Sequence, residues 1–202
     1  MAGNIVHLIG FPGVGKLTIA KEIIRQRPDF VLVDNHLINN PVFSVVKADG
    51  KTPLPAEIWA KASQIRAIVL DTMATLSPSH LSFVMTNVAV EDEEDKAECR
   101  KIEAVAEQRG GQYFPVILTC DVEENRRRIV SPERGPNLKS IDPNEPDRLH
   151  TGRRLLSFEG HPNRIQMDVT HTRPAEAAKR ILQEVGRTRT NTATVKATEF
   201  RP

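Results

Sequence analysis

One stretch near the start of the sequence constrains the fold more than any other feature. The apolar run 5–9 is followed at once by Gly10-Phe11-Pro12-Gly13-Val14-Gly15-Lys16-Leu17-Thr18, and then by residues with helical periodicity. A strand, a glycine-rich turn with a lysine and a helix in immediate succession form the arrangement of a phosphate-binding loop. The glycines let backbone N–H groups point at an anion, while Lys16 and the positive end of the helix dipole add charge. Three glycines at this spacing disfavour the alternative, an ordinary turn with a chance lysine.

The hydroxyl group of this loop stands one position later than in the general pattern. Leu17 directly follows the lysine, and Thr18 comes next. The form G-x-P-G-x-G-K-x-T resembles adenylate kinase and the nucleoside monophosphate kinases. Shikimate kinases, gluconate kinases and chloramphenicol phosphotransferases are more distant members of that group. Taken as a whole, the chain most resembles uncharacterised bacterial ATPases or kinases of this group, of the AAA type.

The resemblance implies a binding site for ATP and Mg²⁺. Mg²⁺ would be held mainly through water, the nucleotide and a carboxylate elsewhere, with Thr18 at a phosphate and the metal. The residues that the resemblance places around ATP are Gly10, Pro12, Gly13, Val14, Gly15, Lys16, Leu17 and Thr18.

Length and composition indicate a single domain with its own core. The chain has 202 residues, 39% of them hydrophobic and 27% charged, with a net charge of +2. We expect one domain over 1–186 and a flexible tail over 187–202. The near-neutral charge does not favour a nucleic-acid or membrane partner, and the sequence has no leader or membrane-spanning run. Two cysteines at apolar positions make a reducing cytoplasm the simplest setting.

The apolar periodicity predicts strands that alternate with helices. Strands are expected at 5–9, 30–33, 81–85, 113–119 and 164–169. Helices are expected directly after the loop, at 56–76, from the acidic run 91–95 to about 109, at 121–130 and at 174–186. This order predicts an α/β fold of the P-loop nucleoside triphosphate hydrolase type: a three-layer sandwich with a five-stranded parallel sheet. Proline and glycine predict irregular chain at 35–55 and at 131–163, the latter with a lid over about 131–154.

Ligands of such sheets bind at the carboxyl ends of the strands, which selects Asp34 as a candidate catalytic residue. Asp34 follows the second strand, where a carboxylate could accept a hydroxyl proton or hold Mg²⁺ through water. The alternative is that the Asp34 side chain only caps the irregular segment, by hydrogen bonding to the backbone of that segment. The third strand ends in Thr86-Asn87 where many phosphate-loop enzymes have a metal-binding aspartate, so more of that chemistry falls on Asp34.

Arginines after the fourth strand form the second strong feature. A guanidinium can stack on a base or bind a phosphate in two-pronged fashion. The resemblance implies Arg128 for the nucleotide and Arg134 for a lid clamp on the transferred phosphate, with Arg126 and Arg127 as open alternatives to Arg128. Arginines at a helix end also simply complement its dipole.

Other polar residues leave their roles open. His36 with Asn35, Asn39 and Asn40 either lines an acceptor pocket or forms a turn. Arg66 on the long helix could bind an anionic acceptor, but a lone helical arginine is more often solvated, which is what we expect. The six histidines lie on separate elements and predict no metal site. The acidic run 91–95 is expected to begin a helix rather than bind a metal.

These features predict an ATP- and Mg²⁺-dependent phosphotransferase that acts on a small-molecule acceptor. Residues 86–90 lack the D-G-[FY]-P-R segment of nucleoside monophosphate kinases, which favours another hydroxyl compound as the acceptor. The alternative is an ATP-binding or ATPase switch module without kinase activity. The sequence leaves the acceptor, the choice between ATP and GTP, and the oligomeric state open.

Overall fold

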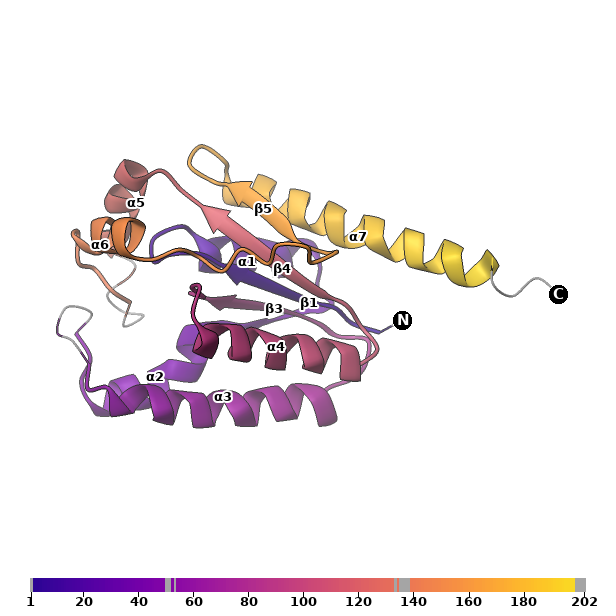
Figure 1. Cartoon of the computed structure of the whole chain (residues 1–202), viewed down its shortest axis with the longest axis horizontal. Helices are drawn as coiled ribbons and strands as arrows, with labels where there is room; N and C mark the ends of the chain where they lie inside the picture. Colours follow the sequence, from indigo (N-terminus) through magenta and orange to yellow (C-terminus); the bar gives the residue numbers. More distant parts are fainter. Residues whose placement is uncertain (1, 50–51, 53, 133, 135–138, 199–202) are drawn as a thin grey trace.

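A computed structural model describes residues 2–49, 52, 54–132, 134 and 139–198 (Figure 1). The strands are β1 (Ile5–Ile9), β2 (Phe30–Val33), β3 (Ser82–Asn87), β4 (Tyr113–Thr119) and β5 (Ile165–Asp168). The helices are α1 (Lys16–Gln26), α2 (Asn35–Val45), α3 (Glu57–Thr75), α4 (Glu93–Gln108), α5 (Val122–Ile129), α6 (Glu145–Gly152) and α7 (Pro174–Thr198). The predicted five strands and the α/β class are confirmed.

The five strands form one parallel sheet in the order β2-β3-β1-β4-β5. The chain begins in the central strand β1, goes to the edge strand β2 and returns to β3 beside β1. It then crosses to β4 on the other side of β1 and ends at the opposite edge strand, β5. The order therefore reverses next to β1. In an open parallel sheet this is where a crevice opens at the carboxyl ends, and the glycine-rich loop leaves β1 at that end.

Alternating side chains of the strands pack against two helical layers. Val6 and Leu8 of β1 face a core shared with α1 and α7, where Ile23 and Ile181 are fully buried. Ile5 faces the opposite core, shared with α3 and α4. Figure 1 shows α7 and the pair α3–α4 on the two sides of the sheet. This is the three-layer sandwich that the alternation of strands and helices predicted.

Two segments predicted to be irregular contain helices. Within 35–55 the chain forms α2, although Pro41 lies inside it, and within 131–163 it forms α6. Proline removes one donor, but α2 is stabilised by burial of Ile38 and Phe43 against its neighbours. Because the sequence pattern does not reveal this packing, Pro41 led to the prediction of an irregular segment.

The last helix runs further than the sequence predicts. We expected it to end at Gly186, and that end is wrong, because α7 continues to Thr198. One glycine costs a helix only about 1 kcal/mol, and no proline follows before Pro202. The segment 187–202, predicted as a flexible tail, is thus helical as far as Thr198, and 199–202 lie outside the described residues.

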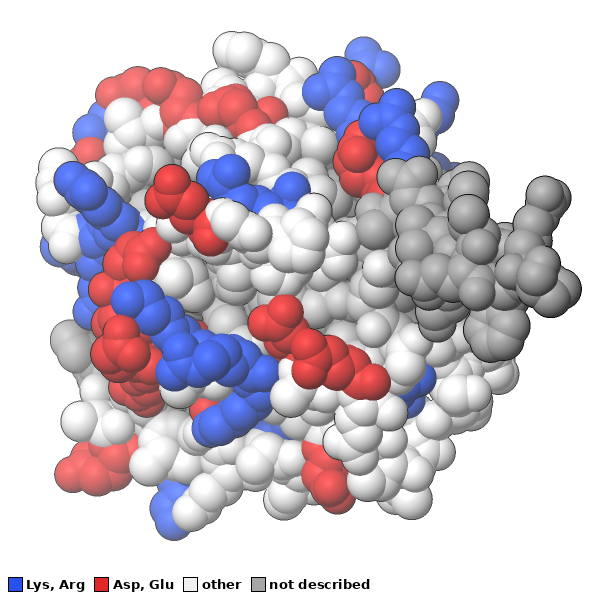
Figure 2. Space-filling model, turned by 45° about the vertical axis from the view of Figure 1, so that its right-hand side comes forward, with Lys and Arg blue, Asp and Glu red and all other residues white. Residues whose placement is uncertain are grey.

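Lysine and arginine side chains intermix with aspartate and glutamate over the face drawn in Figure 2. Among the described helices, none is both long enough and apolar enough to span a bilayer.

Candidate functional site

The glycine-rich loop has a backbone that other residues could not adopt. Gly13 and Gly15 have φ angles of 89° and 103°, in the left-handed region that favours glycine. A Cβ atom at Gly10 would stand 2.7 Å from the Leu118 carbonyl oxygen, and one at Gly13 would stand 2.8 Å from Asn125 Nδ2. The loop is therefore held tightly between β4 and α5, and Gly15 leads directly into α1.

Neighbouring side chains fix the rest of the loop. Asn125 is 1% exposed and donates to the Pro12 carbonyl at 3.0 Å. Val14 is buried in the core beside α1, whereas Leu17 is half-buried and Thr18 is exposed in the first turn of that helix. Sequence reasoning missed Asn125, whose only signal is its place inside a short polar helix.

Lys16 lies folded against the loop that carries it. Its Nζ donates to the carbonyl oxygens of Gly10 at 2.6 Å and Phe11 at 3.0 Å. Burial, followed by the charges of Arg134 and Lys139, lowers the pKa of Lys16 to about 7, with Asp34 acting in the opposite direction. The loop thus holds a cation whose charge is costly without an anion beside it.

Asp34 stands where β2 ends and α2 begins, and its carboxylate is held from the neighbouring strand. The Thr86 hydroxyl donates to Asp34 Oδ1, while Thr86 Oγ1 accepts from the Asn35 backbone N–H at 3.1 Å. Asp34 precedes the first residue of α2, yet its side chain makes no capping hydrogen bond there. The alternative that the Asp34 side chain merely caps this segment is therefore disfavoured. Thr86, which the rule of strand ends places next to the site, holds the Asp34 carboxylate.

A cluster of polar side chains extends from Asp34 across α2 and α3. Arg66 donates to Asn35 Oδ1 at 2.9 Å and lies 3.8 Å from Glu98, with its side chain only 15% exposed. The expectation that Arg66 is solvated is wrong, because α4 supplies a carboxylate that no pattern around Arg66 reveals.

His36 lies in the same region as Asp34. Its Nδ1 is 3.4 Å from Asn40 Oδ1, and burial lowers its pKa to about 4 against the opposing effect of Asp34. It is therefore neutral at pH 7. His36 and its asparagine neighbours belong to a helix rather than to a turn.

The arginines of α5 separate into three different environments. Arg128 donates to the Val14 carbonyl at 3.3 Å and to the Thr170 carbonyl at 2.8 Å, joining the loop to the connection after β5. Arg127 is exposed and pairs with Glu124. Arg126 pairs with Asp147 of α6. Of the three, Arg128 is the one in contact with the loop.

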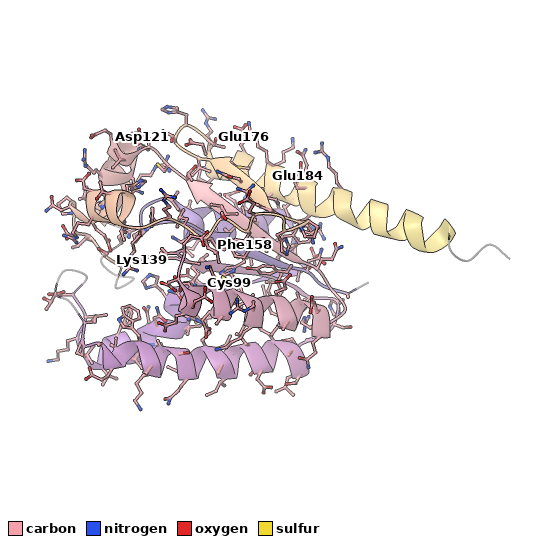
Figure 3. The ribbon with its side chains drawn as sticks, in the orientation of Figure 1. Cys99, Asp121, Lys139, Phe158, Glu176 and Glu184 are labelled. Carbon is pink, nitrogen blue, oxygen red and sulfur yellow. The ribbon has the colours of Figure 1, made fainter. Side chains whose placement is uncertain are left out.

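A second set of charges approaches Lys16 from the chain between α5 and α6. Arg134 Nε donates to the Ser140 carbonyl at 2.9 Å, and the Lys139 N–H donates to the Arg134 carbonyl at 3.3 Å. Lys139 lies between α6 and α2 in Figure 3, and burial lowers the pKa of its ammonium group while Asp34 raises it. Glu145 at the start of α6 raises the pKa of Lys16 and Arg134.

The structure thus brings Lys16, Asp34, Arg134 and Lys139 into one electrostatic neighbourhood at the carboxyl end of the sheet. Lys139 and Glu145 were missed, because nothing in their sequence context distinguishes them from other charges in a polar segment. Among the described residues, no group of three or more potential metal ligands (His, Cys, Asp or Glu) occurs. The acidic run begins α4 as expected, with the Asp92 side chain accepting from the Asp95 N–H.

The fold is that of P-loop kinases. The structure is similar to a gluconokinase from Sinorhizobium meliloti 1021 (TM-score 0.64, 16% identity, covering 96% of this chain and 97% of that one). It is also similar to a shikimate kinase from Acinetobacter baumannii in complex with shikimate (TM-score 0.56, 18% identity, 93% and 95%). A thymidylate kinase from Candida albicans gives TM-score 0.56 at 12% identity, covering 93% of each chain.

These neighbours include the kinds of kinase that the loop sequence resembles, so that expectation of fold is confirmed. No protein-family model matches the sequence, and no curated protein matches it either.

Proposed function

We propose that this protein transfers the γ-phosphoryl group of ATP to a hydroxyl group of a small-molecule acceptor. The observation that carries the proposal is the position of Asp34, which shares one neighbourhood with Lys16 and whose side chain makes no capping hydrogen bond. Phosphoryl transfer needs positioned phosphates, a group that orients the acceptor and cations for the transferred charge. The loop with Lys16, the carboxylate of Asp34 and the lid cations would serve these three needs in turn.

The donor set near the loop fits Mg²⁺ bound largely through water and phosphate. Asp34 supplies a carboxylate oxygen, and Thr18 is exposed in the first turn of α1, so its hydroxyl is accessible to a phosphate or the metal. Mg²⁺ usually keeps several waters and takes only one or two protein carboxylates. When bound, it would neutralise charge on the phosphates. Asp34 would accept the proton of the acceptor hydroxyl or orient that hydroxyl for attack.

Residues 131–154 would act as a lid over the phosphates. Arg134 is held by the Ser140 carbonyl and lies close enough to Lys16 to lower its pKa. Closure would bring this guanidinium onto the transferred phosphoryl group and exclude water. Arg128, which bridges the loop and the connection after β5, would support the nucleotide side.

The acceptor would enter over residues 35–66, between α2 and α3. The neutral ring of His36 and the Arg66–Asn35 pair would line this entrance. A sugar acid, an antibiotic alcohol, a nucleoside or an RNA end each carries a suitable hydroxyl group. The absence of a D-G-[FY]-P-R segment at 86–90 argues against a nucleoside monophosphate. The two free, buried cysteines are compatible with a reducing cytoplasm.

The test is acceptor-dependent release of ADP from MgATP, with a panel of nucleosides, sugar acids and phenicol- or aminoglycoside-type alcohols. Asp34→Asn should lower turnover about 10²- to 10⁴-fold while ATP still binds, because it removes a proton acceptor from the reaction and no phosphate contact. Asp71→Asn, an exposed change on α3, is the matched control and should keep full turnover.

If ATP binds but no acceptor raises ADP release above the blank, the nucleotide-switch alternative gains support. Equal turnover in Asp34→Asn and the unchanged protein would refute the catalytic role of Asp34.

A further inference from the structure

The connection between α6 and β5 crosses the sheet without forming a helix (Figure 1). It is pinned to the chain after β3: Leu155 forms a β-bridge with Val90, and the Leu156 N–H donates to the Ala89 carbonyl at 2.9 Å. Further along, Phe158, labelled in Figure 3, packs against Tyr113 with ring centroids 6.2 Å apart. The crossing segment is therefore held at both ends.

A cavity of about 350 Å³ remains between this segment, β4, β5 and the first half of the glycine-rich loop. That volume lies at the lower end of the range for small-molecule sites. Phe11, Ile117 and Leu155 give it apolar walls. Val14, one of the loop residues placed around ATP, lines it, so the cavity adjoins the nucleotide loop. Lys16, Asp34 and Arg134 do not line it, so it does not include the charged groups assigned above to phosphoryl transfer.

The charged side chains that line this cavity are both arginines. Arg154 and Arg164 line it beside the ring of His150, and its lining residues include no aspartate or glutamate. Arg164 is held in place by the Ser157 carbonyl at 2.6 Å and by the Gln166 side chain. The exposed guanidinium of Arg154 forms no hydrogen bond or ion pair with any residue in the described part of the chain. One positioned cation and one available cation suit an anion.

Two further observations point to an occupant with an aromatic body and a hydrogen-bond donor. The rings of Phe11 and His150 lie 5.1 Å apart at one side of the cavity, where a flat molecule could pack against them. Asn125, another lining residue, uses Nδ2 for the Pro12 carbonyl, which fixes the orientation of its amide. Its buried Oδ1 has no partner among the described residues, so an N–H or O–H donor brought by a ligand would satisfy it.

We propose that this cavity is a second binding site, for a small aromatic organic anion, and that it is occupied independently of ATP. The proposal stands apart from the phosphotransferase function and from the identity of its acceptor.

The probe is 8-anilinonaphthalene-1-sulfonate, an aromatic anion with an N–H group, titrated by fluorescence into the full-length protein. We expect saturable binding at one site, unchanged by a saturating non-hydrolysable ATP analogue. Arg154→Gln should weaken this binding about tenfold through loss of a charge-assisted contact. Arg153→Gln is the matched control. Arg153 is exposed and adjacent to Arg154 but does not line the cavity, so this variant should bind the probe like the unchanged protein.

A second variant tests the volume of the cavity together with the position of Arg164, which the Gln166 side chain helps to hold. Gln166 is an exposed lining residue on β5, so Gln166→Trp should fill the cavity and block the probe without disturbing the core. An unchanged melting temperature would show that the fold is intact. Equal probe affinity in Arg154→Gln and Arg153→Gln, non-saturable binding, or displacement of the probe by the nucleotide analogue would each overturn the proposal.

Discussion

Binding of ATP should draw a proton onto Lys16 at alkaline pH. In the ligand-free protein the pKa of Lys16 is about 7, lowered first by burial and then by Arg134 and Lys139. A triphosphate placed in the loop would favour the ammonium form and move this pKa back upward. With a pKa of about 7, roughly nine tenths of Lys16 is neutral at pH 8, so binding should take up about 0.9 proton.

The same linkage sets how ATP affinity depends on pH. Between pH 8 and pH 9 the cost of protonating Lys16 rises by nearly a full pKa unit, so the affinity should fall about ninefold, on the order of 1 kcal/mol. The phosphates of ATP are fully ionised over this range, since a phosphate monoester has its second pKa near 6. The contribution of Lys16 to this pH dependence should vanish below pH 6, where Lys16 is already charged.

Calorimetric titration at pH 8 in buffers of different ionisation enthalpy measures the proton uptake directly. Lys16→Arg is the matched control, because a guanidinium stays charged throughout this range and should take up no proton. Uptake near zero in the unchanged protein would refute the lowered pKa. Equal uptake in Lys16→Arg would assign the proton to another group.

Three further predictions follow from burial and charge. Arg134→Ala should slow phosphoryl transfer about 10³-fold while barely changing ATP affinity, and equal losses in both measurements would exclude a role in the transition state. Stability should fall from pH 6.5 to pH 4, because the folded protein keeps His7 (pKa about 3) and His36 (pKa about 4) neutral while the unfolded chain protonates both. Each histidine contributes roughly 1.4 kcal/mol per pH unit to this dependence. His7→Gln should therefore remove about half of the slope measured in denaturant titrations, and an unchanged slope would contradict this prediction. Phe114→Ala, at a site 1% exposed, should cost about 3–5 kcal/mol of unfolding free energy, and a loss below about 1 kcal/mol would mean that the cavity collapses.

Much of the site could be predicted because parallel sheets place their ligands by a general rule. The rule that sites form at the carboxyl ends of strands selected the glycine-rich loop and Asp34. The structure places both at that edge, with Lys16 and Asp34 close enough to affect one another electrostatically. The choice between Arg126, Arg127 and Arg128 could not be made from the sequence, since all three follow one another on a short helix and only packing decides which one contacts Val14.

Long-range partners account for the features that pattern reasoning missed. Arg66 finds Glu98 on another helix, and Asp34 finds Thr86 on the neighbouring strand. Helix α2 forms despite Pro41 because Ile38 and Phe43 are buried. In each case the deciding contact joins residues distant in the chain, or depends on burial that local propensity does not include.

By itself, the sequence determined the glycine-rich loop, the order of strands and helices, and hence the parallel sheet. These depend on local backbone requirements, such as the positive φ angles of Gly13 and Gly15, and on side-chain periodicity. Only the tertiary structure decided which charges surround Lys16, how Asp34 is oriented, and that a cavity with basic residues lies beside the loop. Electrostatic interaction and burial act through space, so they exist only once separate segments of the chain have packed together.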